Sequence, residues 1–344
     1  MTTEVIKIDA ASPAPEKLEA AAQIIKNGGL VAFPTETVYG LGADATDEAA
    51  AKKIYSAKGR PSDNPLIIHI SRPEDAEMYA HTSELYYKLA GAFMPGPLTV
   101  ILPKKETIPT SVTGGLDSVA VRCPSHPIAK ALIAAAGTAI AAPSANLSGS
   151  PSPTCAEHVI SDLTGRVDMI IDGGDCEIGL ESTIVKLDGN SATLLRPGAI
   201  THDALLCVCE RVDIAPAVTE RLGENERPLS PGMKYRHYAP SAPLVLLDGK
   251  DEDTLEYMIK MQREQNCAII CYNEEASLLS DNMVISIGAR DDLASQASSL
   301  FAALRVADKF GADIIYAHLP PQRGIGLALY NRMIRAAAHT IKKV

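Results

Sequence analysis

The stretch that decides the fold is FPTETVYGLG, residues 33–42. It follows the apolar run Leu30-Val31-Ala32, which is typical of a buried strand. Pro34 has no N–H to donate, so the strand should end there, and we expect a polar loop closed by the two glycines. A helix is expected next, at 47–57. Open α/β sheets bind ligands where a strand ends in a loop before a helix, although an ordinary strand–turn–helix has the same pattern.

Composition narrows the class of protein. A chain of 344 residues suggests two domains, and 46% apolar with 22% charged residues is typical of a globular protein. No apolar run approaches the roughly 18 residues of a membrane helix, and the N-terminus has no secretory signal. A net charge of −10 with 4% aromatic residues argues against a broad RNA-binding surface. The seven scattered cysteines indicate reduced thiols in the cytoplasm.

Helices and short apolar strands alternate through the first 200 residues. The helices are expected at 15–27, 47–57, 83–92 and 127–136, and the strands at 30–32, 66–70, 98–102, 118–122, 139–142, 168–172, 182–187 and 193–196. Several of these strands end in polar or cationic residues, which is more than ordinary turns would explain. Asp172 and Asp175 could bind a metal, but Asp-Gly turns are common.

Five strands and loops carry candidate binding residues. The loop Lys58-Gly59-Arg60-Pro61 holds two cations beside rigid prolines, which suits phosphate oxygens. Arg122 ends an apolar strand, so it needs an anion, either from a ligand or from an internal acid. The small residues of 143–149 would let a ligand approach the backbone. Arg196 ends another strand, and His69 is either a core histidine or a ligand-binding one.

The chain changes character at 215–243, which we expect to be a linker. Its part at 230–240 is aromatic and basic, so it should fold onto a domain rather than act as a spacer. A regular β-α pattern follows at 244–344 and predicts a smaller doubly wound domain. There is no dinucleotide fingerprint and no P-loop. The strands of this smaller domain are expected at 244–247, 268–271, 283–287 and 312–317, and its helices at 252–265, 274–279, 291–310 and 325–341.

A set of motifs in the first 210 residues resembles one family. The motifs are PTETVYGL at 34–41, KGRP at 58–61, NPL at 64–66, PGP at 95–97, PSAN at 143–146 and EST at 181–183. In this order and spacing they resemble the YrdC-like domain of the threonylcarbamoyl-AMP synthase family. The SPGMKYRHY segment at 230–238 and the trailing α/β domain resemble the two-domain form of that family.

The resemblance implies an α/β fold. It implies a YrdC-like twisted open mixed sheet with helices at 1–214, a linker acting as an active-site lid at 215–243, and a smaller doubly wound Rossmann-like domain at 244–344. We further suppose that this C-terminal domain anchors the lid.

The same resemblance implies the reaction. L-threonine, bicarbonate and ATP, with magnesium, would give threonylcarbamoyl-AMP and pyrophosphate in a nucleotidyl transfer. The product would pass to tRNA threonylcarbamoyl-transfer proteins that modify certain tRNAs beside the anticodon. Direct tRNA binding would be weak or absent, and no membrane would be involved.

Residue roles follow from the motif positions. The catalytic cations would be Lys58 and Arg60. Those that bind L-threonine would be Thr37, His69, Arg122, Ala142 and Ser182. Those that bind ATP would be Arg60, Asn64, Ser118, Ser144, Asn146, Ser152, Arg196 and His237. No protein side chain is expected to hold the metal.

Two other functions remain open at this level. One is a non-catalytic module that binds double-stranded RNA or tRNA, which the net charge disfavours and a steep salt dependence of binding would favour. The other is a carbamoyl-transfer module like those of hydrogenase-maturation proteins, which carry zinc-finger and acylphosphatase segments that this chain lacks.

Overall fold

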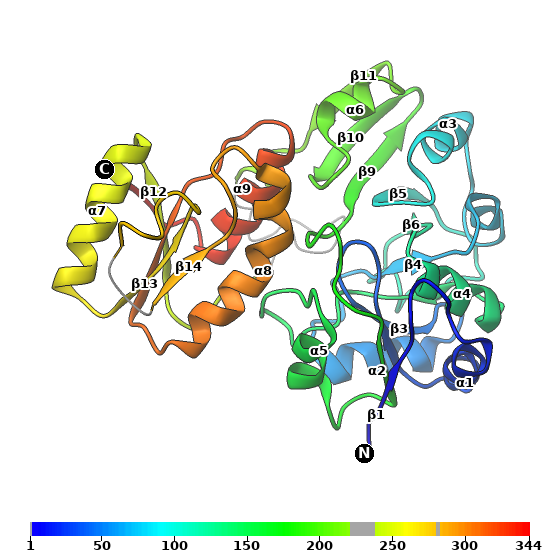
Figure 1. Cartoon of the computed structure of the whole chain (residues 1–344). Coiled ribbons are helices and arrows are strands. Elements are labelled where there is room, and N and C mark those ends of the chain that lie inside the picture. Colours follow the sequence, from blue (N-terminus) through cyan, green and yellow to red (C-terminus); the bar gives the residue numbers. More distant parts are fainter. Residues whose placement is uncertain (1, 221–237, 280–282) are drawn as a thin grey trace. The chain divides into compact units, whose positions relative to one another are not determined.

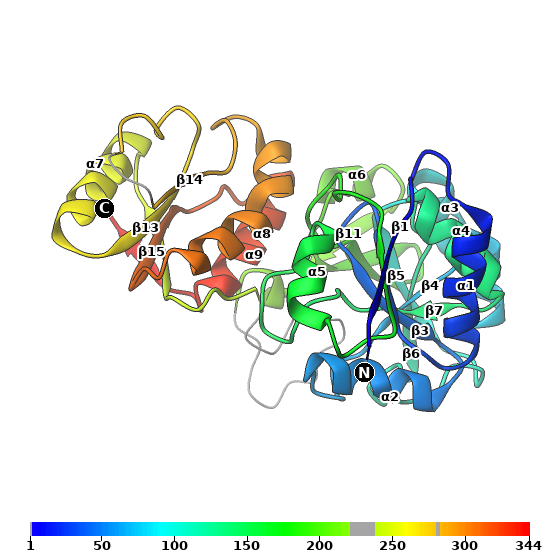
Figure 2. The same ribbon diagram turned by 60° about the horizontal axis from the view of Figure 1, so that its bottom comes forward.

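The computed structural model of the chain describes residues 2–220, 238–279 and 283–344 (Figures 1 and 2). The described residues form two compact units, the first of 2–148 and 152–220 and the second of 149–151, 238–279 and 283–344. Most of the expected lid, with His237, lies outside the described residues, so its role stays a prediction. None of the described helices has the length and apolarity to cross a membrane.

The first unit is a mixed α/β fold, as expected. Its strands are β1 (Glu4–Lys7), β2 (Val31–Phe33), β3 (Gly40–Asp44), β4 (Ile67–His69), β5 (Leu98–Pro103), β6 (Ser118–Arg122), β7 (Ile140–Ala141), β8 (Met169–Asp172), β9 (Thr183–Asp188), β10 (Ser191–Arg196) and β11 (Arg211–Ile214). Its helices are α1 (Pro15–Lys26), α2 (Glu48–Lys58), α3 (Glu84–Phe93), α4 (Pro127–Ala136), α5 (Ala156–Leu163) and α6 (His202–Leu206), with 3-10 turns η1 (Pro73–Met78) and η2 (Pro216–Val218). Within the described residues the strands form one 11-stranded sheet, β1-β8-β2-β3-β7-β4-β6-β5-β9-β10-β11. The expected helices and strands of this unit are confirmed, whereas β1, β3, α5, α6 and β11 were not expected.

The loop expected after Pro34 is shorter than the sequence indicated. Residues 40–44 form strand β3, which pairs antiparallel with β2 and places Gly42 opposite Val31. A Cβ atom on Gly42 would lie 2.7 Å from the side chains of Ile140 and Phe33, so only glycine fits there. The expectation of a loop was wrong because glycine usually weakens a strand, whereas here it allows close packing.

Helices α1 and α4 lie side by side in the first unit (Figure 1). They pack on β2 and β8 through one apolar cluster that includes Ile25, Leu132, Val31 and Ile171, all fully buried. At about 25 cal/mol for each Å² of apolar surface removed from water, such burial is the main force that holds the sheet and its helices together. The sheet is thereby held as a rigid support for the loops at its strand ends.

The second unit is a parallel sheet with helices on both faces, which confirms the expected doubly wound domain. Its strands are β12 (Leu244–Asp248), β13 (Cys267–Cys271), β14 (Val284–Ser286), β15 (Ile314–His318) and β16 (Ile341–Lys343). Its helices are α7 (Asp251–Glu264), α8 (Leu293–Lys309) and α9 (Ile325–Ala336). In the part of the chain described, the strand order is β14-β13-β15-β12-β16. Helix α7 covers one face, and α8 and α9 cover the other (Figures 1 and 2).

Two expectations for this unit were wrong. The short helix expected at 274–279 consists of turns. The last helix ends at Ala336 rather than near 341, because Ala338 and His339 adopt left-handed φ angles of 47° and 62°. An α-helix cannot continue through that conformation, and the chain instead forms the edge strand β16.

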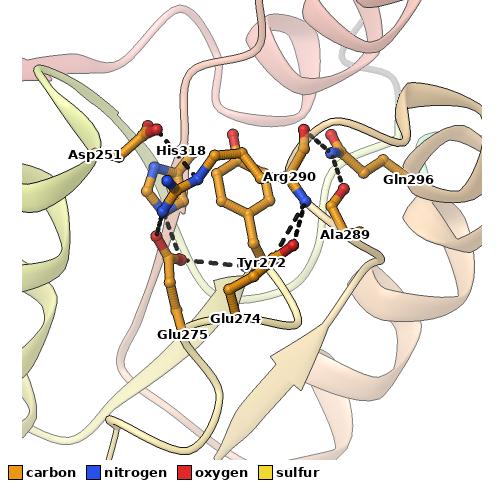
Figure 3. Close-up of polar contacts among 8 residues, drawn as sticks. All are labelled: Asp251, Tyr272, Glu274, Glu275, Ala289, Arg290, Gln296 and His318. Atoms are coloured by element: carbon orange, nitrogen blue, oxygen red, sulfur yellow. Dashed lines mark hydrogen bonds and ion pairs between the residues drawn. The ribbon is translucent and has the colours of Figure 1, made fainter.

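A network of ion pairs joins three loops at the carboxyl edge of the second sheet (Figure 3). The buried Glu275 carboxylate lies 2.8 Å from His318 Nε2 and 3.4 Å from Arg290 Nη2. His318 stacks on Tyr272 with ring centroids 4.4 Å apart. Burial raises the pKa of Glu275, but the hydrogen bond and charge of His318, together with the charge of Arg290, hold it below its ordinary value. Glu275 is therefore a carboxylate that ties the loops together.

Candidate active site

The loop between β2 and β3 is held by the hydroxyl of Thr35. Thr35 Oγ1 donates to the carbonyl oxygen of Val38 at 2.6 Å and accepts from the backbone N–H of Thr37 at 3.2 Å. It also lies 2.9 Å from Thr37 Oγ1. The backbone N–H of Ile178 donates to the Glu36 carbonyl at 2.9 Å. Such hydroxyl-to-backbone bonds stabilise turns, so this loop is fixed on both sides of Glu36.

Glu36 and Arg122 form a buried ion pair. Arg122 Nη2 donates to Glu36 Oε1 at 2.7 Å, and the two side chains are 5% and 6% exposed. The anion that the sequence required for Arg122 is therefore internal in this structure. Burial raises the pKa of the Glu36 carboxyl, but the charge and hydrogen bond of Arg122 outweigh it and hold the pKa below its ordinary value. The pair is therefore charged at neutral pH.

His69 lies beside this ion pair, because β4 and β6 are paired with His69 opposite Arg122. Burial, followed by the charge of Arg122, lowers the pKa of His69 to about 3. The imidazole is therefore neutral at physiological pH. Its Nδ1 atom is buried and has no hydrogen-bond partner among the residues described, and the same is true of Glu36 Oε2 and Asn64 Oδ1. Buried polar atoms without partners are rare in proteins and are often found at functional sites.

A second group of residues joins helix α2 to the loop after β7. Asp47 caps the start of the helix, where its Oδ1 accepts the backbone N–H of Ala49 at 2.7 Å, and Gly59 with φ 62° follows its last residue. This places Lys58 in the last turn. Lys58 Nζ donates to the carbonyl oxygen of Ser144 at 2.5 Å and also to that of Asn146. The ammonium group therefore holds the loop in place.

The same loop is held by its own side chains. Ser144 Oγ donates to Asn146 Oδ1 at 2.6 Å, and the backbone N–H of Ser148 donates to the Lys58 carbonyl at 2.9 Å. The structure thus brings Lys58, Ser144 and Asn146 into one contact group. Ala142 stands just before it, and its backbone N–H donates to the carbonyl oxygen of Ile67 at 2.9 Å.

Arg60 is buried and lies in the same loop as Asn64, between α2 and β4. Its Nη2 donates to the carbonyl oxygen of Pro65 at 3.0 Å, and its Nε donates to that of Asn64 at 3.3 Å. The guanidinium therefore shapes the loop before β4. A buried cation of this kind needs acceptors or anions around it.

A third group lies at the ends of β9 and β10. Arg196 donates to Ser182 twice, from Nε to the carbonyl oxygen at 3.0 Å and from Nη2 to Oγ at 3.1 Å. Ser182 Oγ is also 2.7 Å from Thr99 Oγ1 on β5. Because Thr99 pairs with Arg122 across β5 and β6, the third group adjoins the buried ion pair. Arg122 and Ser182, the candidates for binding L-threonine, therefore lie close to Arg196, a candidate for binding ATP, on neighbouring strands.

Two candidates lie apart from these contacts. Ser118 begins β6, at the opposite end of that strand from Arg122, and within the described ranges no hydrogen bond joins it to another candidate. Ser152 is buried and donates to Glu181 Oε1 at 2.5 Å. His237 falls outside the described residues. The roles of all three in ATP binding stay predictions.

Sequence reasoning assigned no binding role to two acids that the structure buries, Glu36 and Glu181. Both stand inside motifs that the sequence singled out, at 34–41 and 181–183. Their partners, Arg122 and Ser152, are 86 and 29 residues away in the chain. The usable signal was Arg122 itself, because a cation on an apolar strand requires an acid nearby.

Comparison with known proteins shows which family the chain resembles along its length. Residues 23–198 match the family model described as "Telomere recombination", and residues 200–338 match "Threonylcarbamoyl-AMP synthase, C-terminal domain". The chain is 45% identical over 338 residues to threonylcarbamoyl-AMP synthase of Pyrococcus abyssi, covering 95% of this chain and 96% of the relative. It is 45% identical over 325 residues to that of Bacillus subtilis, covering 93% of each chain. The crystal structure of P. abyssi Sua5 complexed with L-threonine superposes with a TM-score of 0.92 at 43% identity, over 99% of this chain and 100% of that one.

Proposed function

The chain belongs to the threonylcarbamoyl-AMP synthase family, and we propose that it converts L-threonine, bicarbonate and ATP into threonylcarbamoyl-AMP and pyrophosphate. The observation that carries this proposal is the extent of the match, which covers 95% of this chain and 96% of the P. abyssi relative and so includes both units. By its chemistry the reaction is a nucleotidyl transfer, in which AMP passes from ATP to a carbamate oxygen.

The buried cations suit such a transfer. The carbamate carboxylate attacks the α-phosphorus and pyrophosphate leaves, so the attacking group and the phosphate chain are both anionic. Fixed positive charges reduce their repulsion and stabilise the charge that develops in the transition state. Lys58, Arg60 and Arg196 are buried and fixed by hydrogen bonds to backbone carbonyls. In our proposal these three cations face the phosphates of ATP.

L-threonine is the proposed amino-acid substrate. The related P. abyssi structure is a complex with L-threonine, and Arg122, His69 and Ser182 lie on neighbouring strands here. Arg122 would bind the carboxylate, while the small neutral groups around it would contact the side chain. Bound in this way, the amine could be carboxylated next to ATP. Positioning of the reactants then supplies much of the rate.

Magnesium is proposed to enter with ATP. The described residues contain no group of three or more His, Cys, Asp or Glu side chains arranged to hold a metal ion. In our proposal the phosphates of ATP, rather than a protein cage, hold the magnesium. Magnesium usually keeps several waters and binds substrate phosphates, which needs few protein ligands.

The lid at 215–243, with His237, is proposed to cover the nucleotide. Threonylcarbamoyl-AMP is a mixed anhydride that water would hydrolyse, so a cover that excludes water would protect it. Its consumers would be proteins that transfer the threonylcarbamoyl group to tRNA. This chain would then need no strong tRNA binding of its own, in keeping with its net charge of −10.

The proposal is tested by pyrophosphate release from ATP and magnesium, measured with and without L-threonine and bicarbonate. We expect release to require both, and to fall at least about 100-fold in Arg60→Ala, because fixed charges of this kind contribute that much. The matched control is Arg72→Ala, which removes an exposed arginine that pairs with Asp75. Release without L-threonine, or salt-sensitive tRNA binding without any release, would contradict the proposal.

A further inference from the structure

The buried ion pair of Glu36 and Arg122 uses only part of the bonding capacity of each group. Arg122 reaches the carboxylate through a single N–H, from Nη2 to Oε1 at 2.7 Å. Glu36 Oε2 is buried and accepts no hydrogen bond from the described residues. Arg122 Nη1 donates to none of them either. An arginine–carboxylate pair that served only as a structural clamp would commonly be bidentate.

The two unused positions belong to a cation and an anion that are in direct contact. An α-amino acid has the same arrangement, because its ammonium and carboxylate are attached to one carbon atom. A cation and an anion that each keep a free bonding position are therefore complementary to such a zwitterion. Leaving Oε2 buried and unpaired disfavours the ligand-free state, which a bound ligand would relieve.

We propose that Glu36 is a substrate-contacting residue whose Oε2 accepts a hydrogen bond from the amine of bound L-threonine, while Arg122 holds the carboxylate. This inference rests on the proposed function, since it assigns a partner within the same site. It adds a recognition role for Glu36, which ensures that the amino acid binds with its amine beside a fixed negative charge.

Charge decides between the amine and the hydroxyl of threonine as the partner of Oε2. An ammonium group that leaves water needs a nearby anion, whereas a hydroxyl is satisfied by neutral groups. His69 Nδ1 is neutral, buried and unpartnered among the described residues, and Thr37 and Ser182 offer hydroxyls. The neutral groups can therefore serve the hydroxyl, and Glu36 is the acid in contact with Arg122 that can serve the amine.

The ligand reaches Oε2 by a small movement. The side chain of Glu36 is 6% exposed, and Oε2 is its shielded atom. The terminal torsion of a glutamate is broad and roughly two-fold, so the carboxylate can turn Oε2 toward the ligand while its other oxygen keeps Arg122. Because the pKa of Glu36 lies below its ordinary value, the group holds the amine as an anion and is a weak base.

The test compares three ligands by calorimetry on the full chain: L-threonine, 3-hydroxybutyrate, which lacks the amine, and L-2-aminobutyrate, which lacks the hydroxyl. In the wild type we expect removal of the amine to weaken binding about tenfold to a hundredfold, the range for a charge-assisted hydrogen bond. In Glu36→Gln that ratio should fall to about threefold or less, while the ratio for the hydroxyl stays unchanged. Any general disturbance of Arg122 affects all three ligands alike and cancels in the ratios.

The matched control is Glu275→Gln in the second unit, another buried carboxylate paired with an arginine. It should leave both ratios at their wild-type values. An amine ratio that is the same in Glu36→Gln and in the wild type would overturn the inference, as would a change confined to the hydroxyl ratio. Thermal unfolding of each variant shows that it is folded.

Pyrophosphate release separates this inference from the proposed function. If the wild type releases pyrophosphate only with L-threonine but the amine ratio does not depend on Glu36, the inference fails and the synthase proposal stands. If the amine ratio depends on Glu36 but no threonine-dependent release occurs, the amino-acid site stands and the synthase proposal fails.

Discussion

Lys58 Nζ donates to the carbonyl oxygen of Ser144 at 2.5 Å, across 86 positions of the sequence. The last turn of α2 is thereby fastened to the loop that follows β7. Lys58 is 2% exposed, so its ammonium group depends on these carbonyls for its hydrogen bonds. The Lys58 side chain therefore both fixes the loop after β7 and supplies a positive charge there.

Replacing Lys58 should both destabilise the protein and weaken its use of ATP. In Lys58→Met the carbonyls of Ser144 and Asn146 lose a donor, and each unsatisfied buried group costs about 1–3 kcal/mol. We expect the free energy of unfolding to fall by about 2–4 kcal/mol, and the KM for ATP to rise at least about tenfold. Urea unfolding and pyrophosphate release measure the two effects. Lys52→Met, which removes an exposed lysine of the same helix, is the control, and an equal effect of both substitutions would contradict the prediction.

Removing one partner of the Glu36–Arg122 ion pair should destabilise the protein more than removing both charges. Arg122→Met leaves the Glu36 carboxylate buried without its partner, which typically lowers the free energy of unfolding by about 3–5 kcal/mol. Glu36→Gln in the same chain removes the stranded charge, so the double variant should recover a large part of that loss. Urea unfolding at pH 7 measures all three proteins. A double variant whose loss equals the sum of the single ones would show that the two groups do not interact.

His69 should make the protein less stable in mild acid. The pKa of His69 is lowered from 6.5 to about 3 in the folded protein, so between these values the unfolded chain binds the proton and the folded chain does not. Stability therefore rises with pH, and it is lost as pH falls below 6.5, by roughly 1 kcal/mol per pH unit. His69→Gln should be less sensitive to pH between 6.5 and 5.

The Glu36 carboxyl also makes the protein more stable as pH rises, but it does so in a lower pH range than His69. Its pKa is held below its ordinary value of 4.5, so its contribution is complete above that value and is lost as pH falls through the lower, folded pKa. Burial also lowers the pKa of His126, so the contribution of His69 is the difference between the wild type and His69→Gln in unfolding measured at pH 6.5, 5.5 and 5. An NMR titration in which the His69 ring signals shift between pH 5 and 8 would contradict the prediction.

The sequence predicted most of the framework because apolar runs, Pro and Gly report directly on local structure. The helix at 47–57 and the strand ending at Arg122 are examples, and both are confirmed. It also indicated that Arg122 requires an anion. It could not name Glu36 as that anion. Glu36 lies in the β2–β3 loop, far along the chain from Arg122 on β6, and only the fold brings the two residues into contact. Contacts between distant segments depend on sheet topology, which local patterns do not encode.

The same limit applies to glycine. Gly42 reads as part of a loop, yet it lies in β3 where a Cβ atom would clash with Phe33 and Ile140. Only the tertiary packing shows that the absence of a side chain is what this strand requires. The candidate residues were found through their motifs, while their hydrogen bonds, such as those from Arg196 to Ser182, required the structure.

The network around Glu275 in the second unit gives a last prediction (Figure 3). Glu275→Ala removes the acceptor of His318 and one of the partners of Arg290. Glu275 and His318 are 2% and 8% exposed, so solvent cannot replace the lost partner, and the loops after β13 and β15 lose their connection. We expect a loss of about 2–4 kcal/mol in the free energy of unfolding, confined to the second unit.

Hydrogen–deuterium exchange of the full chain can locate that loss. Amide protection should decrease in β13, β15 and the loops that follow them, while β4 and β6 of the first unit keep theirs, because local stability follows the contacts of each unit. Glu274→Ala is the matched control, since Glu274 is exposed and its carboxylate accepts the backbone N–H of Arg290 at 3.2 Å. If both substitutions lowered protection equally, the buried contact with His318 would not be what holds this edge of the sheet together.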